Sequence, residues 1–175
     1  MIASADMESW KVVVEAQRSG MDLRDPKIVT FGSAVMVFCG GRRADAASES
    51  LMFQSSDGVI FGDPVRLYGI PDGRWLWHVQ PFGDRFYGTA YCCRNGEYAV
   101  SLYASDNVLA WERLTDFTVP GNGVYLDFDR DGILWSLVRD DLAPACPLTP
   151  EYASGLPYIR GTWLDKSELP PYRMP

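Results

Sequence analysis

The sequence has few of the side chains on which common catalytic and metal sites depend. It contains one histidine, His78, and its four cysteines form no CxxC pair or other metal-ligand spacing. We therefore expect no metal site and no cofactor. The cysteines are interpreted as reduced packing residues of an intracellular chain, because paired cysteines are rare in that compartment.

Positive charge and long hydrophobic runs are scarce as well. Lys and Arg total 16 against 23 Asp and Glu, which gives a net charge of −7. This balance disfavours nucleic acid and anionic membrane as partners, but it leaves room for a local basic pocket that takes a small anion. No run reaches the roughly 18 apolar residues of a membrane span, and MIASADMESW has no basic n-region or apolar h-region. We expect a cytoplasmic protein.

Aromatic residues are abundant, with Trp 6, Tyr 9 and Phe 8, and glycine and proline interrupt the chain every few residues. This composition is typical of many short strands joined by tight turns. Long helical periodicity is absent, and the best helix candidate is a short acidic stretch at 44–49. At 175 residues the chain fits one domain or part of a larger one.

A seven-residue segment recurs along the chain. SSDGVIF at 55–61 is matched by SADMESW at 4–10 and by SDNVLAW at 105–111, where Asp106 and Trp111 align if one extra residue is allowed. The aromatic residues that close these segments lie 51 and 50 residues apart. A period near 50 is typical of propeller blades. The aspartate is expected to bind backbone N–H groups in a tight turn at the outer edge of a blade.

The intervals between these segments repeat one order of strands. Each segment is followed by a short strand, then by an apolar strand ending in a polar turn, a third strand and, in the first two units, a fourth strand. The apolar strands are KIVTFGS (27–33), HVQPFGD (78–84) and YLDFDRDG (125–132). Four strands per unit predicts an all-β propeller.

The recurring segments resemble the Asp-box of the sialidase (neuraminidase) superfamily, Ser-x-Asp-x-Gly-x-x-Trp. LRDPK (23–27), WLWHV (75–79), FYGTAY (86–91) and residues 119–141 resemble, in order, the blades of bacterial sialidase-like glycoside hydrolase propellers. The resemblance implies a sialidase-like β-propeller, with about three four-stranded blades of a five- or six-bladed type within residues 1–141. Its implied ligand is a carbohydrate.

The resemblance also implies that the chain is truncated at both ends, because those propellers have more blades than this sequence supplies. Residues 142–175 form a proline-rich tail that is interpreted as the start of a further blade. Two hypotheses stay open. The chain is a fragment of a longer protein, or it is a reduced propeller that covers its exposed blade faces by forming an oligomer.

The sharpest candidate motif is Arg24-Asp25-Pro26-Lys27, at the entrance of an apolar strand. In the related invertase-type propellers an Arg-Asp-Pro at this place carries an aspartate that binds sugar hydroxyls and stabilises the oxocarbenium-like transition state. Asp25 matches that position and is the catalytic candidate. The alternative is a structural ion pair between Arg24 and Asp25.

The candidate substrate-binding residues come from strands that open the predicted blades. His78 can donate to a hydroxyl or exchange a proton near neutral pH, and Trp77 can stack on a sugar ring, although core packing is the common use of both. Asn122 stands where relatives carry Asn-Glu, and arginines can bind an anion. The set is Arg24, Trp77, His78, Asn122 and Arg139.

Two functions follow from these residues. Glycoside hydrolysis ordinarily needs two carboxyl groups, and only Asp25 has the support of a motif. The chain is therefore either a sialidase-like glycosidase or a non-catalytic propeller that binds a glycan or another protein. Asp127-x-Asp129-x-Asp131-Gly132 matches the opening of a calcium loop, but Val138 replaces the closing glutamate, and we interpret it as a strand that enters an Asp-Gly hairpin.

Overall fold

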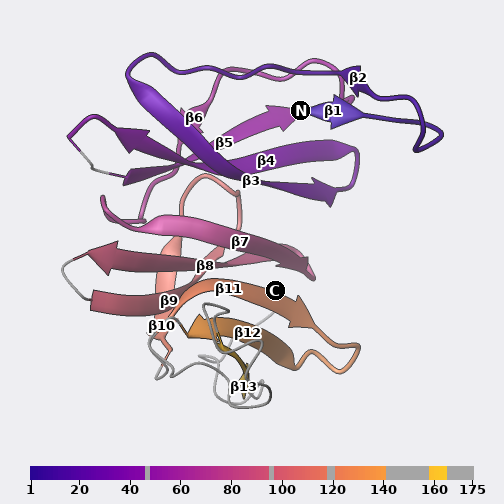
Figure 1. The fold of residues 1–175 in the computed structure, drawn as a ribbon. Helices are drawn as coiled ribbons and strands as arrows, with labels where there is room; N and C mark the ends of the chain where they lie inside the picture. Colours follow the sequence, from indigo (N-terminus) through magenta and orange to yellow (C-terminus); the bar gives the residue numbers. More distant parts are fainter. Residues whose placement is uncertain (46–47, 95–96, 118–120, 141–157, 165–175) are drawn as a thin grey trace, which may run out of the picture.

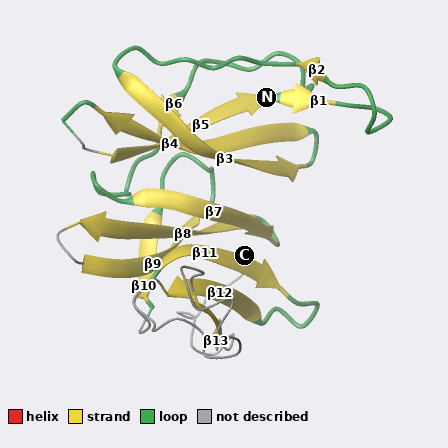
Figure 2. Ribbon diagram, in the orientation of Figure 1, coloured by secondary structure: helices red, strands yellow, loops and turns green. Residues whose placement is uncertain are grey.

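A computed structural model describes residues 1–45, 48–94, 97–117, 121–140 and 158–164. These residues form strands, turns and loops, and no helix (Figure 2). No helical segment that could cross a membrane occurs among them. The predicted all-β class is confirmed. The helix candidate at 44–49 is wrong, because Ser48 begins a strand in which Glu49 is buried and paired with Arg43 at 3.1 Å.

The strands form three antiparallel sheets and a two-stranded ribbon. The first sheet contains β3 (Met21–Phe31), β4 (Ala34–Arg43), β5 (Ser48–Ser55) and β6 (Val65–Arg66). The second contains β7 (Trp75–Phe82), β8 (Arg85–Arg94), β9 (Glu97–Ser105) and β10 (Glu112–Asp116). The third contains β11 (Asn122–Phe128), β12 (Leu134–Asp140) and β13 (Tyr158–Leu164). The ribbon pairs β1 (Ile2–Ala3) with β2 (Lys11–Val12). The last strand of the third sheet comes from the segment that the sequence analysis assigned to the tail.

The three sheets stack face to face, and each begins with a strand that lies at one edge (Figure 1). We call β3, β7 and β11 the inner strands. β7 contacts β3 on one side and β11 on the other, so that the inner strands follow one another through the stack. In the first two sheets the long strands follow one another in the predicted order, but the short strand after a recurring segment, β6 or β10, pairs with the sheet before it and does not open the next one.

Apolar side chains fill the space between consecutive layers. One buried cluster joins the first sheet to the second and includes Met36, Phe38, Leu76 and Phe86. Another joins the second sheet to the third and includes Tyr87, Leu102, Val124 and Leu126. A third, formed by Val37, Cys39, Leu51 and Phe53, lies on the other face of the first sheet and contacts Met1. The facing sides of consecutive sheets are buried because each sheet covers the other.

The recurring segments form the same hydrogen-bonded turn. Asp57 Oδ1 accepts from Val59 N at 2.8 Å and from Ile60 N at 2.9 Å, and Ser55 Oγ donates to it at 2.9 Å. Asp6 does the same in the first segment, with Ser4, Glu8 and Ser9. The turn therefore stabilises the outer edge of a sheet, as predicted.

The alignment of the third segment is wrong by one residue. Asn107, and not Asp106, occupies the aspartate position, because Asn107 Oδ1 accepts from Leu109 N at 3.0 Å and from Ala110 N at 2.8 Å. Asp106 instead forms an ion pair with Arg85 at 2.5 Å. An amide oxygen accepts the same hydrogen bonds as a carboxylate, so the third segment needs no extra residue.

The acidic run of the third sheet forms a hairpin, as predicted. Asp129 Oδ1 accepts from the backbone N–H groups of Asp131 and Ile133, each at 2.9 Å, and Gly132 has a φ of 79°. The other oxygen of Asp129 accepts from Trp135 Nε1 at 3.0 Å. The carboxylate is thus used by the turn itself.

Candidate functional site

The three inner strands share a break in their pairing near the end at which they begin. The register of β3 with β4 shifts between Arg24 and Lys27, that of β7 with β8 shifts between Leu76 and His78, and that of β11 with β12 shifts after Asn122. Bulges of this kind redirect side chains and are common beside binding sites. The sequence candidates Arg24, Asp25, Trp77, His78 and Asn122 therefore all lie at this level, which we call the bulge level.

Asp25 is in the first of these bulges. It is exposed, its φ is 50°, and within the described part of the chain it makes no hydrogen bond or ion pair. An aspartate adopts the left-handed region more readily than most residues, but the conformation still costs energy. The ion pair between Arg24 and Asp25, which was the structural alternative for this motif, is not formed. Arg24 pairs with Asp22 at 2.5 Å, and this contact is exposed on both sides.

Trp77 is the extra residue of the second bulge, and its indole ring is held from three strands. The ammonium group of Lys27 lies 4.1 Å from the ring centroid, which is a cation–π distance. Tyr91 meets the ring edge to face at 5.7 Å. A Cβ atom on Gly123 would lie 3.6 Å from the indole, so β11 approaches it closely. The ring joins β3, β8 and β11 at the bulge level.

His78 points from the second sheet toward the third. Its Nε2 donates to the carbonyl oxygen of Leu126 at 3.0 Å, and its ring centroid lies 4.4 Å from that of Tyr125. Burial lowers the pKa of His78 below 6.5, and the positive charge of Lys27 acts in the same direction. The Leu126 carbonyl and the charge of Asp127 oppose this shift. His78 is therefore neutral at pH 7 and acts as a donor to the backbone.

The remaining candidates lie on the third sheet. Asn122 opens β11 opposite Arg139 of β12, so Arg139 is one strand away from the inner edge. Arg139 is exposed. Asp127 is further along β11, where its Oδ1 lies 3.5 Å from Gln80 Nε2.

The structure thus brings Trp77, His78 and the start of β11 together, and it places Asp25 on the neighbouring inner strand. Lys27 and Tyr91, which contact the ring of Trp77, were not among the residues predicted for the site. A signal for Lys27 was present. Aligning KIVTFGS with HVQPFGD places Lys27 at the position of His78, and both residues contact the following sheet.

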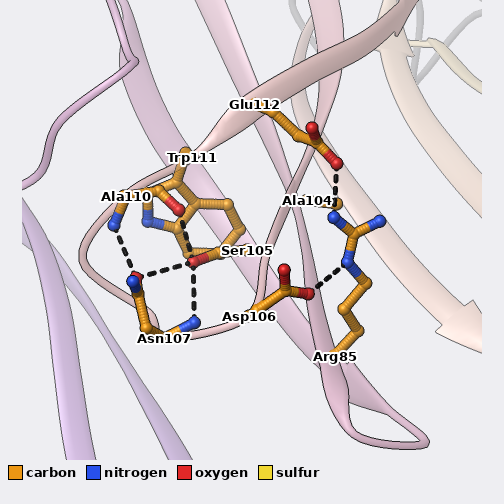
Figure 3. A pocket seen from close by; sticks show the side chains of 8 residues that line it. All are labelled: Arg85, Ala104, Ser105, Asp106, Asn107, Ala110, Trp111 and Glu112. Atoms are coloured by element: carbon orange, nitrogen blue, oxygen red, sulfur yellow. Dashed lines mark hydrogen bonds and ion pairs between the residues drawn. The ribbon is translucent and has the colours of Figure 1, made fainter. Parts of the chain in front are cut away.

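Among the described residues, no group of three or more His, Cys, Asp or Glu side chains is placed to hold a metal ion. A shallow pocket of about 270 Å³ lies at the turn formed by the third recurring segment (Figure 3). Arg85 crosses it between Asp106 and Glu112, and Trp111 lines it. It shares no lining residue with the bulge level, and its arginine is already neutralised by two carboxylates.

Comparisons with known proteins give a fold but no sequence family. No protein-family model matches the chain, and neither does any curated protein sequence. The β-fructofuranosidase BmSUC1 of Bombyx mori, from glycoside hydrolase family 32, superposes with a TM-score of 0.63 and 17% identity over 95% of this chain and 40% of its own. An N-acetylgalactosamine deacetylase from F. plautii gives 0.61 and 18%, over 92% and 54%. A family 43 endo-arabinanase from Bacillus licheniformis gives 0.57 and 16%, over 91% and 57%.

These identities are low, so the superpositions concern the backbone. The chain spans 40 to 57% of the length of these structures. Its three stacked sheets, each beginning with an inner strand, correspond to consecutive blades. The chain therefore has the β-propeller fold of glycoside hydrolases and their structural relatives.

Proposed function

We propose that the bulge level of the inner strands binds a carbohydrate. The observation that carries this proposal is the repeated bulge, which places an exposed carboxylate, an indole and the start of β11 at the same level of three adjacent strands. Carboxylates accept hydrogen bonds from sugar hydroxyls, and indole rings pack on the apolar faces of sugars. One superposed structure, the F. plautii deacetylase, was solved with blood group B trisaccharide, which supports this ligand class.

The charges at the bulge level favour a neutral sugar. Asp22 and Asp25 bring two negative charges on β3, and Arg24 and Lys27 bring two positive charges. Arg24 is already paired with Asp22, and the ammonium group of Lys27 lies over Trp77. A sialic acid carboxylate would need arginines that are available for paired hydrogen bonds. The recurring turns still relate the fold to the sialidases in this proposal. The charge distribution nevertheless favours a ligand other than sialic acid.

Binding is better supported than hydrolysis. Lys27 on β3 and Tyr125 on β11 occupy equivalent positions. Asp25 precedes this position by two residues, and Asp127 follows it by two residues, so the two carboxylates are four residues apart along the strand direction. Four residues of strand correspond to about 13 Å, and the two carboxylates also lie on different sheets. The pair is then wider than the roughly 5 to 10 Å across which two carboxyl groups cleave a glycosidic bond. Within the described residues, Asp25 and Asp127 do not form a hydrolytic pair.

The test is binding to neutral and acidic oligosaccharides on a glycan array, followed by calorimetry with the best ligand. Asp25→Asn keeps the shape of the side chain and should weaken binding at least tenfold, because hydrogen bonds to a charged group are stronger. Asp63→Asn is the matched control, since Asp63 is also exposed and lies far along the chain in the loop before β6. It should leave binding unchanged.

Hydrolysis is measured in parallel on a panel of aryl glycosides. Turnover that Asp25→Asn abolishes would establish the enzymatic alternative, in which Asp25 acts on the sugar. Binding that survives Asp25→Asn, or that falls equally in Asp63→Asn, would contradict the site. A preference for sialylated glycans would contradict the argument from charge.

A further inference from the structure

Asp25 and Lys27 carry opposite charges on the same strand and do not pair with each other. Only Pro26 separates them in β3, yet neither side chain forms an ion pair within the described part of the chain. Lysine has a flexible four-carbon side chain, which can reach a carboxylate two residues away. A contact elsewhere in the fold therefore keeps the two charges apart.

The ammonium group of Lys27 is held by the indole of Trp77, 4.1 Å from the ring centroid. This contact joins β3 of the first sheet to β7 of the second. Lys27 and Trp77 are half-buried, whereas Asp25 is exposed. Water screens an exposed ion pair and leaves it little net gain, but a partly desolvated cation–π contact keeps more of its strength. The balance therefore favours the ring over the carboxylate.

The ring of Trp77 is itself fixed by its neighbours. Tyr91 meets it edge to face at 5.7 Å, and Tyr91 in turn stacks on Trp75 with the ring centroids 6.4 Å apart. The third sheet approaches the indole at Gly123, where a Cβ atom would lie 3.6 Å away. Lys27 thus occupies ring surface that a sugar would otherwise contact, on an indole that is held in place from two other strands.

We propose that Trp77 is a positioning residue, which holds Lys27 away from Asp25 so that both charges stay available to one neutral sugar. An ammonium group has three N–H donors, and a carboxylate only accepts hydrogen bonds. Lys27 donates to one hydroxyl group of the sugar, and Asp25 accepts from another. The two charges cancel, so the ligand is a neutral sugar with at least two free hydroxyl groups. This inference rests on the proposed carbohydrate site and assigns its indole a role.

The first experiment measures by calorimetry the binding of neutral trisaccharides of glucose, galactose, arabinose and fructose. Lys27→Met removes the ammonium group and keeps an unbranched side chain. It should weaken binding of the best trisaccharide by about tenfold or more, because a charge-assisted hydrogen bond is lost. Lys27→Arg keeps the charge, the donors and the stacking on the ring, and should bind within about threefold of wild type. Lys11→Met is the control, since Lys11 is exposed in β2, and it should bind like wild type.

A double-mutant cycle separates positioning by Trp77 from direct contact with the sugar. If Trp77 acts through Lys27, Trp77→Leu weakens binding in the wild-type background and has no further effect in Lys27→Met. Trp77→Phe keeps a ring under the ammonium group and should bind within about threefold of wild type. In the NMR spectrum of the free protein, the ring should shift the Hε protons of Lys27 upfield, and Trp77→Leu should abolish this shift. Circular dichroism checks that each variant is folded.

The outcomes distinguish this inference from the proposed function on which it rests. Lys27→Met that binds like wild type would overturn the inference, and a loss of binding in Asp25→Asn would still support the site. An effect of Trp77→Leu that persists in the Lys27→Met background would also overturn it, because the ring would then contact the sugar itself. If Trp77→Leu does not fold, the comparison of Lys27→Met with Lys27→Arg decides. Wild type that binds none of the trisaccharides would contradict the proposed function and the inference with it.

Discussion

His78 donates from Nε2 to the main-chain carbonyl oxygen of Leu126 at 3.0 Å, and this hydrogen bond joins the second sheet to the third. Thr89, its cross-strand neighbour, donates in the same way to the carbonyl oxygen of Val124 at 2.9 Å. β11 lies at the edge of its sheet, so these carbonyl groups have no partner strand on that side. The two side chains satisfy them instead.

The protonation of His78 makes this junction sensitive to pH. The pKa of His78 lies below 6.5, chiefly because of burial, so the unfolded chain binds this proton more readily than the folded chain. The stability that neutral His78 contributes is therefore present above pH 6.5 and is lost as the pH falls from there toward the folded-state pKa.

We expect the urea concentration at the unfolding midpoint to decrease when the pH is lowered from about 7.5 to about 5.5. The decrease should be smaller in His78→Gln, which keeps an N–H donor but does not titrate in this range. Because the chain has one histidine, a single imidazole NMR signal reports the pKa. A signal that titrates at or above 6.5 would contradict the prediction.

Gly40 allows the indole of Trp75 to lie against β4. A Cβ atom at this position would lie 2.0 Å from the ring, and Trp75 also stacks on Tyr91, so the ring has little room to move. Gly40→Ala should lower the free energy of unfolding by about 1–3 kcal/mol, the usual cost of overpacking. Gly62→Ala, whose new Cβ would meet its nearest atom at 3.9 Å, is the control for chemical denaturation. Equal effects of the two substitutions would show that packing on Trp75 is not the cause.

The recurring turns place three different residues in the same left-handed conformation, with φ values of 63° at Met7, 72° at Gly58 and 60° at Val108. Gly58→Ala should destabilise the protein by about 1 kcal/mol, because the cost is that of the backbone alone. Met7 is 83% exposed, so Met7→Gly should relieve strain and raise the melting temperature.

Val108 tests the same argument in the opposite direction. It is 8% exposed and packs in the cluster between the first two sheets, so Val108→Gly loses buried contacts. We expect a lower melting temperature despite the same relief of backbone strain. If Gly58→Ala, Met7→Gly and Val108→Gly all shifted stability in the same direction, relief of backbone strain would not explain the effect at the exposed turns.

The aspartates of these turns should make the stability of the protein depend on pH in the acidic range. The pKa of Asp57 is lowered by hydrogen bonds from the backbone N–H groups of Ile60 and Val59 and from Ser55. Its contribution is present above pH 3.8 and is lost as the pH falls through its lowered folded-state pKa. Asp57→Asn should keep the turn, as Asn107 does in the third segment, and should reduce the loss of stability measured between neutral and acidic pH. An unchanged acid transition would contradict this role.

The repeat was sufficient to predict the fold. The spacing of the recurring turns and the order of strands between them depend on local residues such as Asp57 and the Gly-containing hairpins, and local signals of this kind are visible in a sequence. The error at Asp106 arose because aspartate was favoured over asparagine, although both accept the same hydrogen bonds.

The details of the candidate site could be predicted only in part. Its residues were named because they open the inner strands, but the contacts that define their roles join sheets about 50 residues apart. Lys27 on Trp77 and His78 on Leu126 depend on how the sheets stack. The bulge at Asp25, with its positive φ, leaves no mark in the sequence beyond the following proline.

The attachment of β11 through its own backbone has an evolutionary consequence. His78 and Thr89 donate hydrogen bonds to backbone carbonyl groups, which every residue possesses. The attachment of β11 through these bonds therefore does not depend on which side chains the strand carries. Positions such as Tyr125 and Asp127 can therefore change without loosening the junction. A propeller attached in this way is free to alter the residues that face a ligand, one strand at a time, while the sheets stay in place.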